Sequence, residues 1–308
     1  MAAVVSLREP NCGRQLIDAL VNDAYALVKE HGVDLAAASE YQDRISGFFR
    51  QSRETKDVYR RPVIGGLRGY VGIGEEVRPQ RPDGPYDLRE TKECYHSGRK
   101  DNRHPPEYEL DELSNRLFDQ LEHVLERSLA CIGTVIPAIG RLHDGIFPIQ
   151  QKWRGAHLLR MIEYKPDVSA LRLGPHRDLS LLTIMPCPSA KGLEFQKGDG
   201  SWELAPLDQD TLIVTCGYLL ASICASDGVN LPAGVHQVVS VDDVVQRRSL
   251  TFFGMIPLEY EIPVWYERKL GQKTANGAEI MYERLQRSYT SLEAQPFDTW
   301  LSEMREAN

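Results

Sequence analysis

The chain has 308 residues, of which 42% are hydrophobic and 26% charged, and its formal net charge at pH 7 is −8. This composition is typical of a globular protein with a sizeable core. The acidic balance argues against a nucleic-acid partner, because phosphates select basic surfaces.

Membrane and secretory signals are not expected. The longest apolar stretch, residues 212–225, is interrupted by Thr215 and Gly217 and is shorter than the roughly 20 residues needed to span a bilayer. Residues 1–10 lack a basic segment followed by an apolar one, which is the pattern of a secretory signal.

The six cysteines are scattered without a Cys-x-x-Cys pair. We therefore predict reduced thiols and a cytoplasmic location; the oligomeric state stays open.

The first part of the chain reads as helical. Apolar residues recur at helical spacing from Leu16 to Val28, with Gly32 as a plausible end. Residues 35–59 form a second helical zone, and residues 109–132 carry a long apolar stripe typical of a third helix. Between the second and third helices, glycines and prolines at 65–85 predict loops.

After about Gly155 the pattern changes to short strands separated by turn signals. The predicted strands are residues 158–164, 180–185, 193–196, 201–204, 211–216, 235–239 and 249–256. Such strands suggest a double-sheet jelly roll. Near the C-terminal end, Asn276 and Glu279 resemble a capping box that opens another helix.

We therefore predict a mainly β fold with helices: a double-stranded β-helix (jelly-roll, cupin-like) core with a helical N-terminal region and a C-terminal helix. We expect one integrated domain over residues 1–308. Within it, residues 1–150 would be mainly helical, 151–260 would form the core, and 261–308 a C-terminal helical segment.

A metal site is suggested by His176 and Asp178 together with the later His236. Two imidazoles and one carboxylate are the ligands of the facial triad that holds non-haem Fe(II) with open coordination positions. Residues i and i+2 of a strand point to the same face, so His176 and Asp178 could bind one ion from one strand. Taken singly, each histidine would also fit a hydrogen-bonded or core role.

A second constellation contains Arg247, Ser249 and Tyr164. A guanidinium pairs in a bidentate manner with a carboxylate, and a neighbouring hydroxyl can donate to the same group. Arg247 and Ser249 share one face of a predicted strand, whereas Arg248 should face away. Tyr164 ends another strand, and its phenol could complete a carboxylate site. The alternatives are solvated arginines and a core aromatic residue.

Separate segments, in the expected order, resemble the isopenicillin N synthase-like branch of the Fe(II)/2-oxoglutarate oxygenases. They are Phe48-Phe49 with Lys56, Gly69-Tyr70 with Glu75, Lys92-Glu93 with Gly98, Gly174-Pro175-His176-Arg177-Asp178 with Leu181-Leu182-Thr183, Gly192-Leu193-Glu194 with Gly200-Ser201-Trp202, Val235-His236-Gln237-Val238-Val239, and Arg247 to Phe253. The chain departs from the family at Lys165, at the turn Thr215-Cys216-Gly217-Tyr218 and at Gln237. The altered turn leaves the shape of the substrate pocket undecided.

The resemblance implies that His176, Asp178 and His236 bind Fe(II). It further implies that Arg247 and Ser249, helped by Tyr164, bind the distal carboxylate of 2-oxoglutarate. The expected enzyme is a dioxygenase that oxidises an unactivated C–H bond with release of succinate and carbon dioxide. Hydroxylation, desaturation and cyclisation are all open. A small specialised metabolite, such as an antibiotic or amino-acid-derived intermediate, is the expected substrate.

Two other functions stay open: an Fe(II) oxidase of the same fold that needs no 2-oxoglutarate, and a non-catalytic small-molecule binding protein. For the substrate, basic residues in the loop-rich region suggest a carboxylate, with solvated loop charges as the alternative. These residues are Arg60, Arg61, Arg68, Arg99, Lys100, Arg103 and His104.

Overall fold

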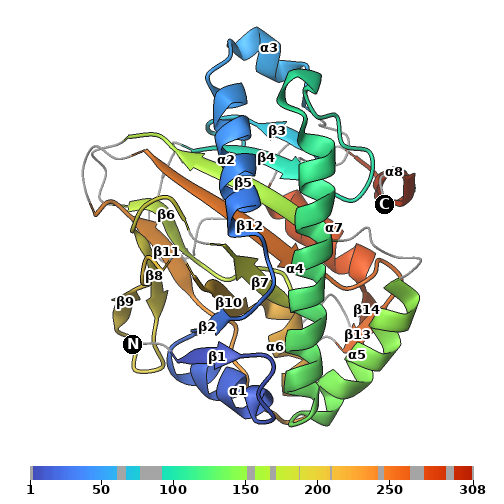
Figure 1. Cartoon of the computed structure of the whole chain (residues 1–308). Helices are drawn as coiled ribbons and strands as arrows, with labels where there is room; N and C mark the ends of the chain where they lie inside the picture. The colour runs from blue at the N-terminus through green and yellow to red at the C-terminus, as the bar shows by residue number, and fades with distance from the viewer. Residues whose placement is uncertain are drawn as a thin grey trace.

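Eight of the described strands form one large sheet, and four form a second sheet that faces it (Figure 1). The computed structural model describes residues 3–60, 67–76, 92–150, 157–166, 171–186, 188–208, 210–241, 246–263, 274–288 and 295–306. The large sheet has the order β1 (Val4–Ser6), β2 (Tyr25–Lys29), β10 (Leu212–Cys216), β7 (Leu182–Met185), β12 (Arg247–Gly254), β5 (Leu158–Tyr164), β4 (Lys92–Ser97), β3 (Gly69–Val71). The second has the order β6 (Leu171–His176), β11 (His236–Val239), β8 (Leu193–Gln196), β9 (Trp202–Leu204), and β13 (Glu261–Pro263) pairs with β14 (Thr274–Asn276).

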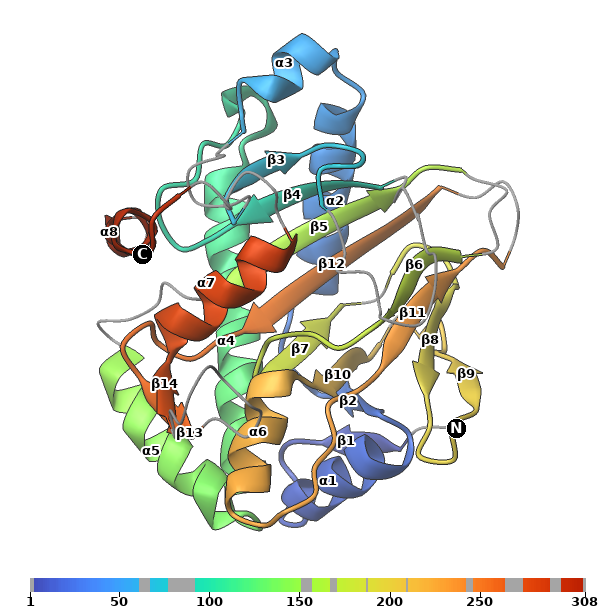
Figure 2. The same cartoon turned by 180° about the vertical axis from the view of Figure 1, so that it is seen from behind.

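Helices α2 (Leu35–Phe49) and α4 (Leu110–Gly133) cover one face of the large sheet, and the view from behind shows α7 (Gly277–Ser288) on the other side (Figures 1 and 2). Ser46 of α2 donates to Glu163 of β5 at 2.6 Å. Phe118 of α4 meets Phe252 of β12 edge-on, with ring centroids 5.6 Å apart. Because side chains alternate along a strand, the residues on either side of Glu163 in β5, and on either side of Phe252 in β12, face the second sheet.

The remaining helices are α1 (Cys12–Asn22), α3 (Arg53–Asp57), α5 (Pro137–Gln150), α6 (Tyr218–Ser226) and α8 (Phe297–Glu306), with a short 3₁₀ turn at Pro106–Tyr108. Of the described helices, none is both long and apolar enough to cross a membrane.

The predicted fold class, a double-stranded β-helix core with helices around it, is confirmed. All the predicted strands are present, with bounds shifted by two residues at most. The predicted capping box is also confirmed, since Asn276 accepts from the Glu279 amide at 2.9 Å and Glu279 accepts from the Asn276 amide at 3.1 Å. The third predicted helix is α4, and the second zone divides into α2 and α3.

The first predicted helix was too long. Helix α1 ends at Asn22, Ala24 takes a left-handed conformation with φ 67°, and Tyr25–Lys29 continues as strand β2. A short apolar run fits a buried strand as well as one face of a helix, so hydrophobic spacing alone does not separate the two. Strands β3, β4 and β6 and helix α5 were not predicted.

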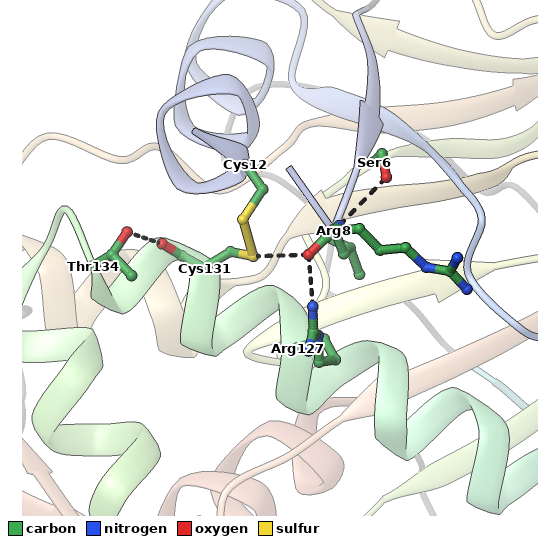
Figure 3. Close-up of a disulfide and its surroundings, with 7 residues drawn as sticks. Ser6, Arg8, Cys12, Arg127, Cys131 and Thr134 are labelled. Carbon is green, nitrogen blue, oxygen red and sulfur yellow. Dashed lines mark hydrogen bonds between the residues drawn. A yellow bond between two sulfur atoms is a disulfide. The ribbon is translucent and has the colours of Figure 1, made fainter. Parts of the chain in front are cut away.

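The prediction that all cysteines are reduced was wrong for Cys12 and Cys131, which form a disulfide between α1 and α4 (Figure 3). Their Cα atoms are 5.7 Å apart although 119 positions separate them in sequence. Only the packing of α1 on α4 brings them together. Cys94, Cys216 and Cys224 are free and buried. The prediction of a cytoplasmic location rested partly on reduced thiols and loses that support.

Candidate metal centre

The two histidines of the predicted triad lie side by side on neighbouring strands of the second sheet. His176 ends β6, His236 begins β11, and the two residues are paired in register with ring centroids 4.1 Å apart. Asp178 lies beyond β6, in the connection to β7. The expectation that His176 and Asp178 extend from one strand was therefore wrong, because the strand ends at His176.

Asp178 lies between the imidazoles. Its Oδ1 is 3.6 Å from His176 Nε2, and its Oδ2 is 3.6 Å from His236 Nε2. One ligand atom from each residue lies within 4.8 Å of the others. Nitrogen and oxygen ligands sit roughly 2.0–2.2 Å from a first-row metal, so neighbouring ligands of one ion are about 3 Å apart. The donor set and spacing fit a single divalent cation. Within the described part of the chain, no second group of this kind occurs.

The backbone orients both imidazoles. His176 Nδ1 donates to the Gly174 carbonyl at 3.0 Å, and His236 Nδ1 donates to the Gly234 carbonyl at 3.3 Å. A carbonyl oxygen can only accept, so the ring proton is held on Nδ1 and the lone pair of Nε2 faces Asp178. Such outer contacts fix the tautomer and ring orientation of metal-binding histidines.

Thr183 of β7 orients the carboxylate, a role that the sequence analysis did not assign. Its Oγ1 donates to Asp178 Oδ2 at 2.8 Å and accepts from Ser180 Oγ at 2.7 Å, and Thr183 is fully buried. The turn after β10 also supports this segment, since the Tyr218 amide donates to the Asp178 carbonyl at 2.8 Å. The sequence signal was a hydroxyl residue on the strand that follows Asp178.

We expect Thr183→Val to weaken metal binding by about 10- to 100-fold, the usual cost of losing an outer-shell partner. Thr183→Ser keeps the hydroxyl and should retain most of the affinity. The measurement is competition with a chromogenic chelator for Mn(II). Thr215→Val is the matched control, because it removes a buried hydroxyl that bonds the Ala24 carbonyl instead. Equal affinities for the Thr183→Val and Thr215→Val proteins would contradict the positioning role.

The predicted carboxylate-binding residues meet on two paired strands of the large sheet. Arg247 of β12 is in register with Tyr164 of β5, and its guanidinium lies 5.4 Å from the ring centroid. Arg247, Tyr164 and Ser249 are 1%, 2% and 5% exposed. Arg247 Nε donates to the Ala190 carbonyl at 3.2 Å, next to the second sheet. The three side chains therefore lie on the face that the two sheets enclose.

Charge and burial suit this group to bind a carboxylate. Burial raises the pKa of Tyr164 above its ordinary value, while the nearby cations Lys92 and Arg247 oppose that shift. The phenol thus stays protonated at neutral pH and can donate a hydrogen bond. Arg248 faces the other way, as predicted, and pairs with Asp43 of α2.

Four of the basic residues predicted to recognise substrate in the loops are paired with protein groups. Arg99 contacts Asp119 and Glu122, each at 2.6 Å. His104 bonds Asp111 and Ser97, Arg60 bonds Asp57, and Arg68 donates to backbone carbonyls. Lys100 and Arg103 are exposed. Arg61 lies outside the described residues. These contacts leave the paired residues poorly suited to bind a substrate carboxylate.

The departures from the resembled family also have local partners. Gln237 donates to Glu194 at 2.7 Å. Lys165 bonds Glu93 at 2.7 Å and Glu163 at 2.9 Å, on the helix-covered side of the sheet. Gly217 is required in the altered turn, because a Cβ there would lie 1.9 Å from the Ser180 carbonyl oxygen.

Two family models match the chain in succession. Residues 4–120 match the model described as the non-haem dioxygenase in morphine synthesis N-terminal region, and residues 155–255 match that of the 2OG-Fe(II) oxygenase superfamily. Together these segments cover well over half of the chain.

Curated relatives point the same way. The chain is 25% identical over 266 residues to a homoarginine-6-hydroxylase of Glycine max, covering 78% of this chain and 76% of the relative. It is 26% identical over 129 residues to the isopenicillin N synthase of Streptantibioticus cattleyicolor, covering 42% and 38%.

Solved structures share the fold. A full-length Neurospora crassa protein in complex with alpha-KG has a TM-score of 0.74 at 19% identity, covering 92% of this chain and 95% of that one. A putative 2OG-Fe(II) oxygenase family protein from Caulobacter crescentus has a TM-score of 0.74 at 23% identity, covering 92% and 98%. At these identities the likeness establishes the fold alone.

Proposed function

Since the chain belongs to the 2-oxoglutarate- and Fe(II)-dependent oxygenase superfamily, in its isopenicillin N synthase-like branch, we propose that His176, Asp178 and His236 hold its iron. The protein is a dioxygenase whose cofactors are Fe(II), 2-oxoglutarate and dioxygen. Iron held by these residues would supply activation of dioxygen, coupled to the conversion of 2-oxoglutarate and dioxygen to succinate and carbon dioxide. The observation that carries the assignment of the ligands is the convergence of two imidazoles on one carboxylate.

For 2-oxoglutarate, the proposed binding group is Arg247, Ser249 and Tyr164. A guanidinium, a hydroxyl and a protonated phenol on one buried face supply the donors that a carboxylate accepts. Desolvation strengthens this contact, since the attraction between charges grows as water is excluded.

The proposed reaction is hydroxylation of an unactivated C–H bond in a small specialised metabolite, with desaturation or cyclisation as the other outcomes of the same chemistry. The proposal is supported by similar proteins whose names or bound ligands refer to small molecules. They are a homoarginine-6-hydroxylase, an isopenicillin N synthase, and the Neurospora crassa protein, which was also solved with thymine. A role in antibiotic biosynthesis is proposed from the second of these relatives. The carboxylate expected on that substrate stays a prediction.

The second candidate is an oxidase of the same fold that takes all its electrons from substrate. The match to an isopenicillin N synthase favours it. The buried Arg247 and Ser249 favour the dioxygenase, because their donors suit a keto acid. A non-catalytic binding protein is less compatible with an assembled ligand triad.

The distinguishing experiment is anaerobic titration of the purified protein with Fe(II) and then 2-oxoglutarate. A weak visible metal-to-ligand charge-transfer band should appear on addition of the keto acid, and admission of air should yield succinate. Iron binding without such a band, and without succinate, would favour the oxidase. Absence of iron binding would leave only the binding protein.

Arg247→Gln is expected to weaken 2-oxoglutarate binding by roughly 30-fold or more, because a buried charge pair that loses a partner costs about 2–5 kcal/mol. The measurement is the 2-oxoglutarate concentration that gives half of the maximal absorbance of the charge-transfer band. Arg248→Gln is the matched control, since Arg248 follows directly on the same strand but pairs with Asp43 on the opposite face. If the two variants bind 2-oxoglutarate equally well, Arg247 is not part of the site.

A further inference from the structure

The proposed 2-oxoglutarate group lies where three neighbouring strands have their ends (Figure 2). Strand β4 begins at Lys92, β5 ends at Tyr164 and β12 begins at Arg247, and these three residues are in register. Tyr164 is therefore the last residue of its strand. Because the ends of regular elements open more readily than their centres, the position of the Tyr164 phenol depends on what holds the chain directly beside it.

The two sequence neighbours of Tyr164 hold it from the opposite face of the sheet. Because side chains alternate along a strand, Glu163 and Lys165 point to the side that α2 covers (Figure 1). Lys165 Nζ lies 2.9 Å from Glu163 Oε1 and 2.7 Å from Oε2 of Glu93, which belongs to β4. Lys165, at which this chain departs from the resembled family, thus joins the end of β5 to β4.

Glu93 and Glu163 are two buried carboxylates that lie directly opposite each other. They are in register on β4 and β5, and their side chains are 3% and 0% exposed. Like charges that face each other across two strands destabilise a sheet, and a buried charge requires a partner. Both carboxylates can stay ionised here only because cations lie beside them.

Glu93 has a second cation besides Lys165. Lys56 of α3 binds Glu93 Oε1, and the Tyr70 phenol donates to the same oxygen. Lys56 Nζ also donates to the Phe49 carbonyl at 3.1 Å. Glu93 would therefore keep a counter-charge and a hydrogen bond if Lys165 were removed.

Glu163 depends on Lys165 for its counter-charge. Its Oε2 accepts from the Ser46 hydroxyl of α2 at 2.6 Å, which is a contact with a neutral group. Arg50 of α2 donates to that hydroxyl at 3.2 Å, and Arg248, in register with Glu163, forms its ion pair with α2 instead. Within the part of the chain that the structure describes, the ion pair of Glu163 is with Lys165 alone.

We propose that Lys165 is a positioning residue for 2-oxoglutarate: by neutralising Glu163 and joining it to β4, it holds the Tyr164 phenol beside Arg247. The inference rests on the proposed function, because it needs 2-oxoglutarate at Arg247, Ser249 and Tyr164. Without Lys165, Glu163 would be a buried charge that has lost its partner. The end of β5 would then shift to bring this carboxylate to water, and Tyr164, the next residue, would move with it. Lys165 itself does not touch the keto acid.

The test is anaerobic titration of the full-length, Fe(II)-loaded protein with 2-oxoglutarate, followed by the charge-transfer band. Lys165→Met removes the charge and should raise the half-saturating 2-oxoglutarate concentration by roughly 10-fold, while the affinity for Mn(II) stays unchanged. Lys165→Arg keeps the charge and should bind 2-oxoglutarate more tightly than Lys165→Met does. Lys165→Gln, which also lacks the charge, takes the place of Lys165→Met if that variant does not fold.

Lys197→Met is the matched control. Lys197 also bridges two carboxylates, Asp23 at 3.4 Å and Glu203 at 2.9 Å, and its side chain is 29% exposed against 32% for Lys165. Its loss should leave the 2-oxoglutarate titration unchanged, because it lies away from β4 and β5. An equal titration of Lys165→Met and Lys197→Met would overturn the proposal.

A second substitution tests whether charge is what Lys165 contributes. Adding Glu163→Gln to Lys165→Met removes the unbalanced carboxylate, and the amide oxygen can still accept from the Ser46 hydroxyl. We expect this double variant to recover most of the wild-type affinity for 2-oxoglutarate. A double variant that binds as weakly as Lys165→Met would overturn the proposal.

The Tyr164→Phe background tests whether Lys165 acts through the phenol. Tyr164→Phe should itself weaken 2-oxoglutarate binding, and Lys165→Met should then add less than about a 2-fold further loss, because no phenol is left to position. A loss from Lys165→Met that is the same in both backgrounds overturns the proposal, and so does a Tyr164→Phe protein that binds 2-oxoglutarate like wild type. A failure of the proposed function looks different, since wild type would then give no 2-oxoglutarate band at all.

Discussion

Changing His236 to alanine is expected to weaken metal binding by more than about 100-fold, beyond the cost of losing an outer-shell partner, and to abolish the charge-transfer band. The variant removes one of the three proposed protein ligands. It leaves only Asp178 and His176. In the wild type, the Nε2 atoms of both imidazoles lie 3.6 Å from the Asp178 carboxylate. The measurements are chelator competition for Mn(II) and the anaerobic visible spectrum with Fe(II) and 2-oxoglutarate.

The control is His123→Ala. His123 lies on α4, and its side chain is 64% exposed. Its loss should leave both the metal affinity and the band unchanged. A full-strength band in the His236→Ala protein would show that His236 is not a ligand, whatever its position. Thermal unfolding of the metal-free protein separates loss of a ligand from loss of fold.

The residues of the candidate metal centre could be picked out from the sequence because they occur in short, ordered motifs. His176 and Asp178 are close in the chain, and Arg247 and Ser249 alternate on one strand. The resemblance supplied the link between these segments and His236. The assignment of each residue to metal or keto acid stays a prediction, as does the single integrated domain over residues 1–308.

Tertiary contacts could not be predicted in the same way. Lys92 belonged to a recognised motif, but its neighbour Arg160 lies on another strand, and their shared Glu76 lies on a third segment. Thr183 acquires its role only when β7 brings it to Asp178. Strand pairing creates each of these contacts, and a hydrophobic pattern specifies strands without specifying partners.

The disulfide is the clearest case of a contact invisible in the sequence, and it predicts a large effect on stability. Replacing Cys12 and Cys131 together by serine opens a loop that spans 119 positions. For a loop of about 100 residues, the entropy of the unfolded chain favours the cross-linked protein by roughly 4–5 kcal/mol. We expect the variant to lose stability of this order, measured by urea unfolding in the absence of reductant.

Reductant should lower the free energy of unfolding of the wild type to that of the double variant, and it should leave the free energy of unfolding of the double variant unchanged. Cys224→Ser is the control for the substitution itself, because Cys224 is free and buried. The Mn(II) affinity and the charge-transfer band should survive in the folded double variant, since the disulfide joins α1 to α4, whereas the proposed ligands lie on β6, on β11 and in the loop after β6. Equal unfolding of wild type with and without reductant would show that the two thiols do not cross-link in solution. The disulfide thus acts on the unfolded chain, and the proposed iron site depends on local contacts in which the disulfide takes no part.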